Sequence, residues 1–577
     1  MIKRLTLKTA KILLPALVMF FFSCTSKDQK QPADLLVLHA NIYTMEDDNP
    51  QATAIAVIDG RIVYVGDDEG VEEYRGEETE TIDLAGATLT PGFIEGHGHF
   101  MGTGMKELEL DLSKTQSYDE LVEQVAEKVK ETAPGEWITG RGWHQDKWTD
   151  RPDTLVKGFQ VHDKLSAVSP DNPVYLRHAS GHAGFANARA MEIAGVNQLS
   201  IENMEDEIDG GEVIRDGLGN PTGIFNEKAM GLITKHVPET DEEIRLRALQ
   251  LAVGACHRHG ITGFHDAGAD RETIALYKKA KAEGLLGVRM YVMIGGGRLA
   301  EERFPDGPVI DTTDHLLTIR AVKLSIDGAL GSRGAWLLED YSDRPGHAGH
   351  NTVPMEQVEV VAMKALEAGF QVCTHAIGDR ANREVLDRYE AAFKALPEKS
   401  RDHRFRIEHA QHLHPEDIGR FAGLGVVPSM QTIHLSSDRP WAIDRLGEQR
   451  IVEGAYVWQK LLQSGARIVN GTDVPVEPLD PLACFYASVT RKTLQGTPTG
   501  GYEPDQKMTR EQALRSYTLD AAYGAFEENI KGSIEAGKLA DFTVFDKDIM
   551  TVAEEEILTT KVVMTIVGGK VVYRALE

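Results

Sequence analysis

The sequence predicts an α/β fold: a (β/α)8 TIM-like barrel with a small β-sandwich domain formed from both termini. Three observations support this prediction. Short apolar stretches alternate with helical stretches through the middle of the chain, β-like alternation recurs at both ends, and potential metal ligands follow several of the central apolar stretches. A length of 577 residues suits an enzyme barrel with insertions and one small accessory domain.

The first 23 residues are typical of an export signal. A cationic region at residues 3–11 precedes an apolar run at residues 12–22, which is short for a transmembrane helix. A small residue followed by Cys24 marks the place where a bacterial lipoprotein signal is cut and lipidated. We therefore expect a lipid on Cys24, a polar tether over residues 24–33, and anchoring to the cell envelope on its periplasmic or surface face. A plain secretory signal or a short membrane anchor is the alternative.

Both ends of the folded part carry β-strand patterns. Residues 34–89 alternate apolar and polar positions and contain turn signals such as Asp59-Gly60, and residues 540–577 behave in the same way around Gly568-Gly569. Such patterns indicate hairpins. We expect the two segments to form one small β domain.

Residues 90–539 carry the predicted barrel. A large insertion at about residues 105–255 separates its first two strands, and we expect this insertion to cover the mouth. Barrel enzymes place catalysis at the carboxyl ends of the strands. The eight predicted strands are residues 88–94, 260–264, 288–294, 321–326, 370–374, 405–407, 425–429 and 467–470.

Side chains able to bind a metal stand at the ends of five of these strands. The first strand ends in His97-Gly98-His99, and this spacing on an extended backbone points both imidazoles to the same side. Lys323 lies in the otherwise apolar fourth strand, where a buried lysine is costly unless it is paired or neutral. The fifth, sixth and eighth strands end in further candidates: His375, His409 and Asp473. Each signal is weak alone, but together they predict a metal centre.

These motifs resemble the amidohydrolase superfamily, and within it the branch of large amidohydrolases similar to N-substituted formamide deformylase. The resemblance runs from about residue 34 to the C-terminus. It is specific for the family and says little about the substrate. Besides the strand ends, the motifs are Gly140-Arg141-Gly142-Trp143, Gly181-His182, the run from Asp327 to Arg333, His375-Ala376-Ile377-Gly378-Asp379, Glu408-His409-Ala410-Gln411, the run from Gly471 to Val476, and the run from Gly537 to Asp541.

The resemblance implies a site for one or two divalent cations. His97, His99 and Asp473 would hold the first, His375 and His409 the second, and a carbamate on Lys323 would bridge them. Carbamylation turns the awkward lysine into an anion, which removes its desolvation problem. Without it, a mononuclear site of His97, His99, His375 and Asp473 is the alternative. Zinc suits the nitrogen-rich ligands, although imidazole also suits iron and nickel.

The expected reaction is hydrolysis of a non-peptide C–N bond in a small amide, formamide or cyclic amide. A divalent cation supplies hydroxide from bound water and polarises the carbonyl. Asp473 is the expected proton shuttle, and His434, after the seventh strand, is expected to donate to the developing oxyanion. The candidate substrate-binding residues, each of which has a packing or surface role as its alternative, are His182, Trp143 and Arg333.

Other functions remain open at this point. A deaminase of the superfamily typically uses one metal and does not need Lys323, and a D-aminoacylase or dipeptidase is a further possibility. A non-catalytic tethered binding protein is disfavoured because every expected ligand is present. The net charge of −27 excludes nucleic acid as an expected partner. We expect contact with the membrane only through the lipid, and the sequence does not define an oligomeric state.

Overall fold

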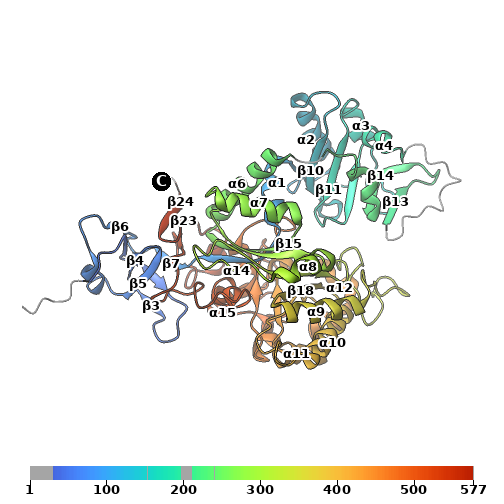
Figure 1. Cartoon of the computed structure of the whole chain (residues 1–577). Coiled ribbons are helices and arrows are strands. Elements are labelled where there is room, and N and C mark those ends of the chain that lie inside the picture. Colours follow the sequence, from blue (N-terminus) through green and yellow to red (C-terminus); the bar gives the residue numbers. More distant parts are fainter. Residues whose placement is uncertain (1–29, 153, 197–210, 239–240, 576–577) are drawn as a thin grey trace, which may run out of the picture.

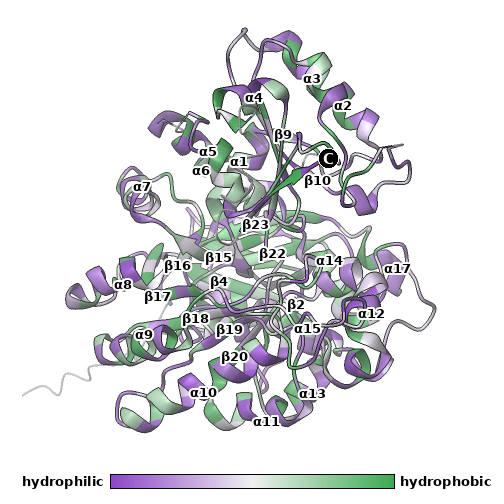
Figure 2. Cartoon of the chain, turned by 90° about the vertical axis from the view of Figure 1, so that its right-hand side faces the viewer, coloured by the Kyte–Doolittle hydropathy of each residue, from purple (hydrophilic) through white to green (hydrophobic). Residues whose placement is uncertain are grey.

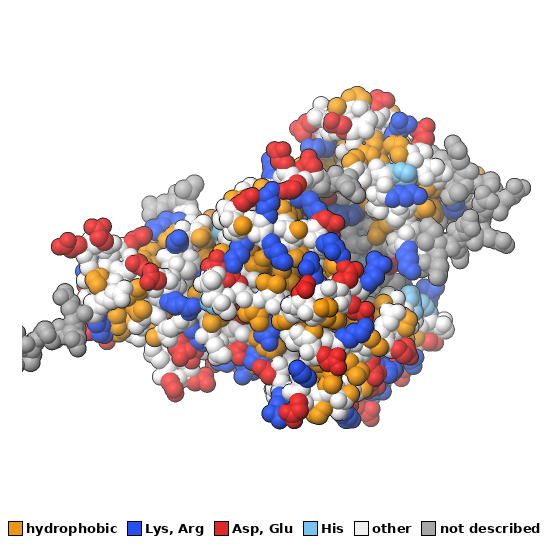
Figure 3. All heavy atoms as spheres, viewed as in Figure 1, with side chains coloured by type: hydrophobic (Ala, Val, Ile, Leu, Met, Phe, Trp, Pro, Cys, Tyr) orange, Lys and Arg blue, Asp and Glu red, His pale blue; other side chains and the backbone are white. Residues whose placement is uncertain are grey.

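The structure is a computed structural model, and it describes residues 30–152, 154–196, 211–238 and 241–575. The predicted signal, Cys24 and the first part of the tether lie outside these residues. Among the residues described, no helix combines the length and the apolar character needed to cross a membrane. Lys, Arg, Asp and Glu side chains are interspersed over the face drawn in Figure 3, as the composition leads one to expect.

Eight parallel strands form the central sheet, and their order follows the chain. This is the predicted TIM-like barrel, and each strand overlaps one of the eight predicted strands. The strands are β8 (Phe93–Gly98), β15 (Ile261–Ala269), β16 (Arg289–Gly295), β17 (Leu317–Ser325), β18 (Gln371–Ala376), β19 (Arg406–His409), β20 (Val427–Met430) and β21 (Val469–Asn470).

The first predicted strand needs a correction. The stretch 88–94 is divided, because β7 (Thr88–Pro91) pairs with a strand from the C-terminal end of the chain and only β8 enters the barrel. Gly92 marks the division. A Cβ on this residue would lie 2.2 Å from the hydroxyl of Thr262, so the chain can pass from one sheet to the other here only without a side chain.

The first and last barrel strands meet at the point that carries candidate ligands. A Cβ on Gly96 would lie 2.3 Å from the carbonyl oxygen of Asn470, so glycine permits the close approach. The carbonyl of His97 accepts a hydrogen bond from the Asp473 amide at 2.8 Å, and the His99 amide donates to the carbonyl of Val474 at 2.7 Å. These backbone bonds hold the ends of β8 and β21 in a fixed relation.

Helices cover the outside of the barrel (Figure 1). In α9 (Met355–Ala368) the buried positions Val358, Val361 and Ala365 recur every three or four residues, which gives the helix one apolar face. Gly369 ends it in the left-handed conformation. Hydrophobic colour is concentrated in the central strands of Figure 2. The other long covering helices are α6 (Glu242–Arg258), α7 (Arg271–Ala282), α10 (Asp379–Ala395), α11 (Pro415–Leu424), α12 (Ile433–Gly454), α14 (Pro481–Thr490) and α15 (Arg510–Tyr517).

Between β8 and β15 the chain forms α1 (Phe100–Leu108) and then a separate six-stranded sheet, seen at the upper right of Figure 1. Helices α2 (Tyr118–Glu131), α3 (Asp163–Val168) and α4 (Ala188–Ile193) accompany this sheet. We call this part the insertion. It has its own apolar core, which includes Trp143, Trp148 and Phe185. In sheet order its strands are β13 (Gly211–Arg215), β14 (Pro221–Glu227), β12 (Ala183–Ala186), β11 (Val174–His178), β10 (Ile138–Trp143) and β9 (Leu110–Asp111).

Strands from the two ends of the chain share one sheet, in the order β24 (Lys570–Arg574), β23 (Val562–Val567), β22 (Phe542–Phe545), β7, β2 (Asn41–Tyr43) and β3 (Gln51–Ala52). A four-stranded sheet contains β5 (Arg61–Gly66), β4 (Ala54–Ile58), β1 (Leu35–Leu38) and β6 (Glu80–Asp83). Buried residues of both sheets, such as Val37 and Phe542, belong to one apolar cluster. The arrangement of the two sheets as one sandwich domain stays a prediction.

Candidate metal centre

The six predicted metal ligands lie near the carboxyl ends of the barrel strands, which is where parallel barrels gather functional groups. Five strands supply them. His97 lies in β8, His99 caps α1 directly after it, Lys323 lies in β17, His375 in β18, His409 in β19, and Asp473 follows β21.

Asp473 is surrounded by imidazoles. Its Oδ1 lies 3.5 Å from His97 Nε2 and 3.3 Å from His99 Nε2, and its Oδ2 lies 4.0 Å from His434 Nε2. The potential ligand atoms of His97, His409 and Asp473 all lie within 4.8 Å of one another. Side chains from β8, from β19 and from the residues after β21, which are far apart in the sequence, therefore meet at one point.

Lys323 and His375 complete the group. Lys323 Nζ lies 3.3 Å from His97 Nε2, and the rings of His375 and His409 are 4.5 Å apart, centroid to centroid. His375 Nε2 also lies 3.4 Å from Oδ1 of Asp327. The structure therefore places all six predicted ligands around one small volume.

These side chains fit a divalent cation. Asp473 Oδ1 and His375 Nε2 are buried and have no hydrogen-bond partner among the described residues. Leaving such an atom unsatisfied costs about 1–3 kcal/mol, and a cation removes that cost by accepting its lone pair. Imidazole nitrogens with a carboxylate oxygen are a donor set that divalent transition metals bind.

The protonation states of these side chains also favour binding of a divalent cation. Burial, together with the ammonium of Lys323, lowers the pKa of His97 to about 4, and burial holds the pKa of His409 well below its ordinary value. Burial alone would raise the pKa of Asp473, but the imidazoles of His99, His97 and His409 hold it well below the ordinary value. Neutral imidazoles beside an ionised carboxylate are the forms that bind metal.

The unused ring nitrogens of two ligands are fixed from behind. His97 Nδ1 bonds to Oε2 of Glu408, and His409 Nδ1 lies 2.7 Å from Oε1 of Gln431. Because these partners accept, each ring presents Nε2 to the centre. Such outer contacts orient metal ligands and fix their tautomers.

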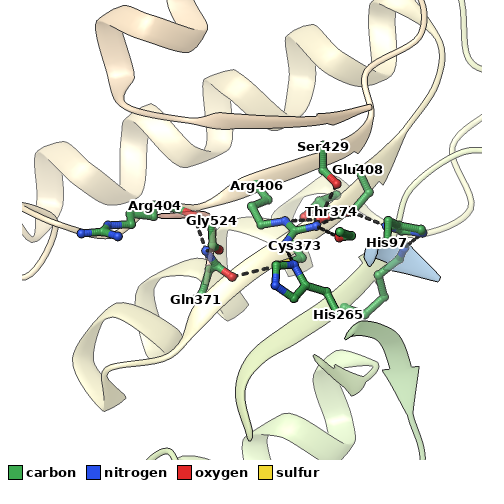
Figure 4. A network of polar contacts seen from close by, with 12 residues as sticks. His97, His265, Gln371, Cys373, Thr374, Arg404, Arg406, Glu408, Ser429 and Gly524 are labelled. Atoms are coloured by element: carbon green, nitrogen blue, oxygen red, sulfur yellow. Dashed lines mark hydrogen bonds and ion pairs between the residues drawn. The ribbon is translucent and has the colours of Figure 1, made fainter. Parts of the chain in front are cut away.

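Glu408 is held in turn by Arg406 (Figure 4). Arg406 Nε donates to Oε1 at 2.7 Å and Nη2 donates to Oε2 at 2.9 Å, and both side chains are fully buried. The guanidinium also bonds to the carbonyl of Gly96, to Ser429 Oγ and to His265 Nδ1 at 2.7, 2.8 and 3.0 Å. The Arg406 charge, against the opposing effect of burial, keeps the pKa of Glu408 well below its ordinary value.

The motifs of the sequence predict no role for Arg406, Glu408 or Gln431. The spacing could have indicated a role, since Arg406 and Glu408 stand two residues apart on one face of β19. The same spacing separates His97 in β8 from His99 just beyond the end of that strand. Asp327 begins one of the family motifs. Its carboxylate accepts the backbone amides of Ile377 and Gly378 at 3.0 and 2.9 Å, so it fastens the loop after β17 to the loop after β18.

The backbone is strained at two of the ligands. His409 and Asp473 adopt φ values of 74° and 60°, in the left-handed region that residues with a side chain rarely occupy. Such conformations cost about 1–3 kcal/mol each and persist where the surroundings over-determine them. The strain coincides with the side chains that converge on the centre.

The other predicted site residues differ in where they lie relative to the metal centre. His434 faces the centre, because its Nε2 lies 4.0 Å from Oδ2 of Asp473. Its Nδ1 lies 2.8 Å from Gln411 Nε2, and its Nε2 is buried without a hydrogen-bond partner among the described residues. Gln411 Nε2 can only donate, so Nε2 of His434 carries the proton. His182 is about one third exposed, and its Nδ1 lies 3.1 Å from Glu227 Oε2.

The other two predicted substrate-binding residues, Trp143 and Arg333, make contacts within the protein. Trp143 has no exposed surface, packs against Phe185, and donates from Nε1 to the carbonyl of Leu176 at 3.0 Å. It fills the core of the insertion and does not line a pocket, so its assignment to substrate binding was wrong. Arg333 pairs with Asp343 at 2.8 Å within the loop that follows β17, and its role in binding stays a prediction.

The model of the amidohydrolase family matches residues 80–573. The chain belongs to this family. This amidohydrolase is 33% identical over 541 residues to YtcJ of Bacillus subtilis (strain 168), covering 92% of this chain and 98% of that protein. It is 28% identical to N-substituted formamide deformylase of Arthrobacter pascens, over 94% of this chain and 99% of the relative. The predicted family is thereby confirmed.

A solved structure agrees with this assignment. A metal-dependent hydrolase from Pyrococcus horikoshii is 26% identical to the amidohydrolase described here and superposes with a TM-score of 0.73, over 90% of this chain and 99% of that one. Together with the cluster of His97, His409 and Asp473, the family identifies the chain as a hydrolase that uses a divalent metal and acts on a small molecule.

Proposed function

We propose that this amidohydrolase cleaves a non-peptide C–N bond in a small amide, formamide or cyclic amide. The observation that carries the proposal is the convergence of His97, His409 and Asp473 on one point, with Lys323 beside His97. The relative from Arthrobacter pascens bears the name of an enzyme that acts on N-substituted formamides, which favours this bond over the ring carbon that a deaminase attacks.

His97, His99 and Asp473 are the proposed ligands of one divalent cation, and His375 and His409 those of a second. Lys323, as a carbamate, is the proposed ligand shared by both, and zinc is the proposed metal. When bound, such a cation lowers the pKa of water toward neutrality and polarises the substrate carbonyl.

The chain's own residues move the protons. Asp473 is ionised at neutral pH, because its surrounding imidazoles hold its pKa low, so it can accept the proton of the attacking water. It then returns that proton to the leaving nitrogen. His434 carries its proton on Nε2, on the side that faces Asp473, and donates it as a hydrogen bond to the carbonyl oxygen while negative charge develops there.

The test is a metal count on purified protein and on Lys323→Met. We expect two divalent ions per wild-type chain, loss of amide hydrolysis after chelation, and recovery with zinc. Lys323→Met should hold at most one ion and lose about 10²-fold or more in kcat, because a thioether cannot form the carbamate. Lys531→Met is the matched control, since Lys531 is a buried lysine paired with Glu527 at 2.6 Å and should leave the count at two.

Several results would contradict the proposal. Purified protein without stoichiometric metal, and hydrolysis that is insensitive to chelation, would remove its basis. An unchanged count of two ions in Lys323→Met would overturn the carbamate. A count of one in both wild type and Lys323→Met would support the mononuclear alternative in place of the bridged pair.

We also propose that the chain is exported and anchored to the bacterial cell envelope by a lipid on Cys24. The support is the order of cationic region, apolar run and small residue before cysteine. Cys24→Ala removes the thiol that lipid attachment needs, so this variant should move from the membrane fraction to the soluble fraction. A wild-type chain already found in the soluble fraction would contradict the anchor.

A further inference from the structure

Arg141 is a cation with few protein partners. It lies near the end of β10, and its guanidinium makes one hydrogen bond to the part of the chain that the structure describes, from Nη2 to the carbonyl of Ala179 at 3.1 Å. Its Nε is buried without any partner in the described part of the chain. No carboxylate of the described residues forms an ion pair with it. Among the described residues, this half-buried guanidinium thus retains donors without an acceptor.

The four most deeply buried arginines among the described residues each form an ion pair with a carboxylate. Burying a charge is costly unless it is paired. Its neighbour on the adjacent strand, Arg177, contacts Glu109 at 2.9 Å. The pairs of the most deeply buried arginines are Arg289 with Asp541, Arg406 with Glu408, Arg439 with Glu503, and Arg491 with Glu503. Arg141 differs from these four arginines. The half-buried Arg320 also lacks an ion pair among the described residues, but its guanidinium lies 3.7 Å from the centre of the Phe526 ring.

Arg141 also lies within electrostatic reach of the metal centre. Burial and the charge of Arg177 lower the pKa of Arg141, while the carboxylate of Asp473 raises it. Contact with Glu227 raises the pKa of His182 against burial, and the same Asp473 raises it further. A Cβ on Gly181 would lie 3.8 Å from Arg141 Nη2, so the Gly181-His182 turn packs beside the guanidinium. The insertion thus brings toward the barrel site a cation that has no carboxylate partner among the described residues.

We propose that Arg141 binds a carboxylate of the substrate, so that the substrates are amides bearing a carboxylate near the scissile C–N bond, such as N-acyl amino acids. The proposal rests on the function proposed above. A guanidinium presents its donors in a planar fork that matches a carboxylate. One unpaired cation balances one negative charge, which favours a carboxylate over a doubly charged phosphate. The insertion then selects the substrate while the barrel supplies the chemistry.

The experiment compares two amides that differ only in the carboxylate: N-acetylphenylalanine and N-acetyl-2-phenylethylamine. The zinc-loaded wild-type protein should turn over the acid with a kcat/KM about 10- to 100-fold higher, the range of a hydrogen bond to a charged group. Arg141→Gln should lose that preference, mostly through KM, and should keep its rate on the neutral amide. Arg141→Lys should restore part of the preference, since it keeps the charge and loses the fork.

Arg177→Gln is the matched control, because Arg177 lies on the adjacent strand and already has Glu109 as its partner. It should leave the preference for the acid unchanged. If wild type turns over both amides equally, or if Arg141→Gln loses both rates together, the carboxylate site is wrong while the proposed hydrolysis stands.

A second readout does not depend on turnover. In metal-free protein, N-acetylphenylalanine should raise the Tm of wild type and of Arg177→Gln, and not that of Arg141→Gln. If neither amide is hydrolysed but this difference in Tm is found, the carboxylate site stands and the proposed function fails. Absence of any Tm shift in wild type, or an equal shift in Arg141→Gln, would overturn the site. A shift produced by inorganic phosphate and not by the amide acid would also overturn it.

Discussion

Replacing Asp473 by asparagine is expected to lower kcat by about 10²- to 10⁴-fold, the range by which a positioned general acid–base group accelerates a reaction. Asparagine keeps the shape of the side chain and removes both its negative charge and its capacity to accept a proton. The loss should appear in kcat more than in KM, because the proton is transferred in the transition state.

Steady-state kinetics on any amide that the wild type hydrolyses, together with a metal count, test this prediction. Asp379→Asn is the matched control. Asp379 follows β18 near the same face, but among the described residues its Oδ1 accepts only the backbone amides of Leu338 and Arg380, at 2.8 and 2.9 Å. It should keep kcat within a few-fold. An Asp473→Asn protein that holds the wild-type metal and retains its kcat would show that another group moves the proton.

The strand ends were predictable because side-chain direction in a strand follows its period of two. His97 and His99 had to share a side, and the five ligand-bearing strands had to meet at one face once the barrel was inferred. The backbone bonds between β8 and the residues after β21, which bring Asp473 to His97, were not predictable, because they depend on closure of the barrel.

The contacts between side chains could not be predicted from the sequence. Trp143 stood in a family motif and was assigned to the substrate, yet the insertion has a core of its own that takes up this ring. Arg141 stood in the same motif, and nothing local indicates that it lacks a carboxylate. That property depends on what the other strands of the insertion place around it, as does the pairing of Glu408 with Arg406 and His97.

Replacing Arg406 by methionine is expected to destabilise the metal-free protein by about 3–5 kcal/mol, the usual cost of leaving one partner of a buried ion pair alone. Glu408 has no exposed surface, and in the variant its carboxylate would keep His97 but lose its two bonds to the guanidinium. Denaturant unfolding at neutral pH measures the loss.

The destabilisation caused by Arg406→Met should depend on pH, and the direction follows from the pKa of Glu408. In wild type the pKa of Glu408 is held below its ordinary value, so the pair stabilises the fold above a pH of about 4.5, and this contribution is lost as the pH falls toward the lowered pKa. In Arg406→Met the pKa of Glu408 rises, and its carboxyl group can be protonated at low cost near pH 4. The difference in unfolding free energy between the two proteins should therefore shrink as the pH falls from 7 to 4.

The zinc affinity of Arg406→Met tests whether Arg406 positions a metal ligand or only stabilises the fold. Since Arg406 holds Glu408, and Glu408 fixes the Nδ1 side of His97, the variant should bind zinc about 10- to 100-fold more weakly, as loss of an outer contact to a metal ligand does. Arg289→Met is the control, because Arg289 and Asp541 also form a buried pair, at 2.6 Å, and this pair contacts no candidate ligand among the described residues. It should lose comparable stability and keep its zinc affinity. Equal zinc affinities in the two variants would reduce Arg406 to a structural residue and leave the orientation of His97 to Glu408 alone.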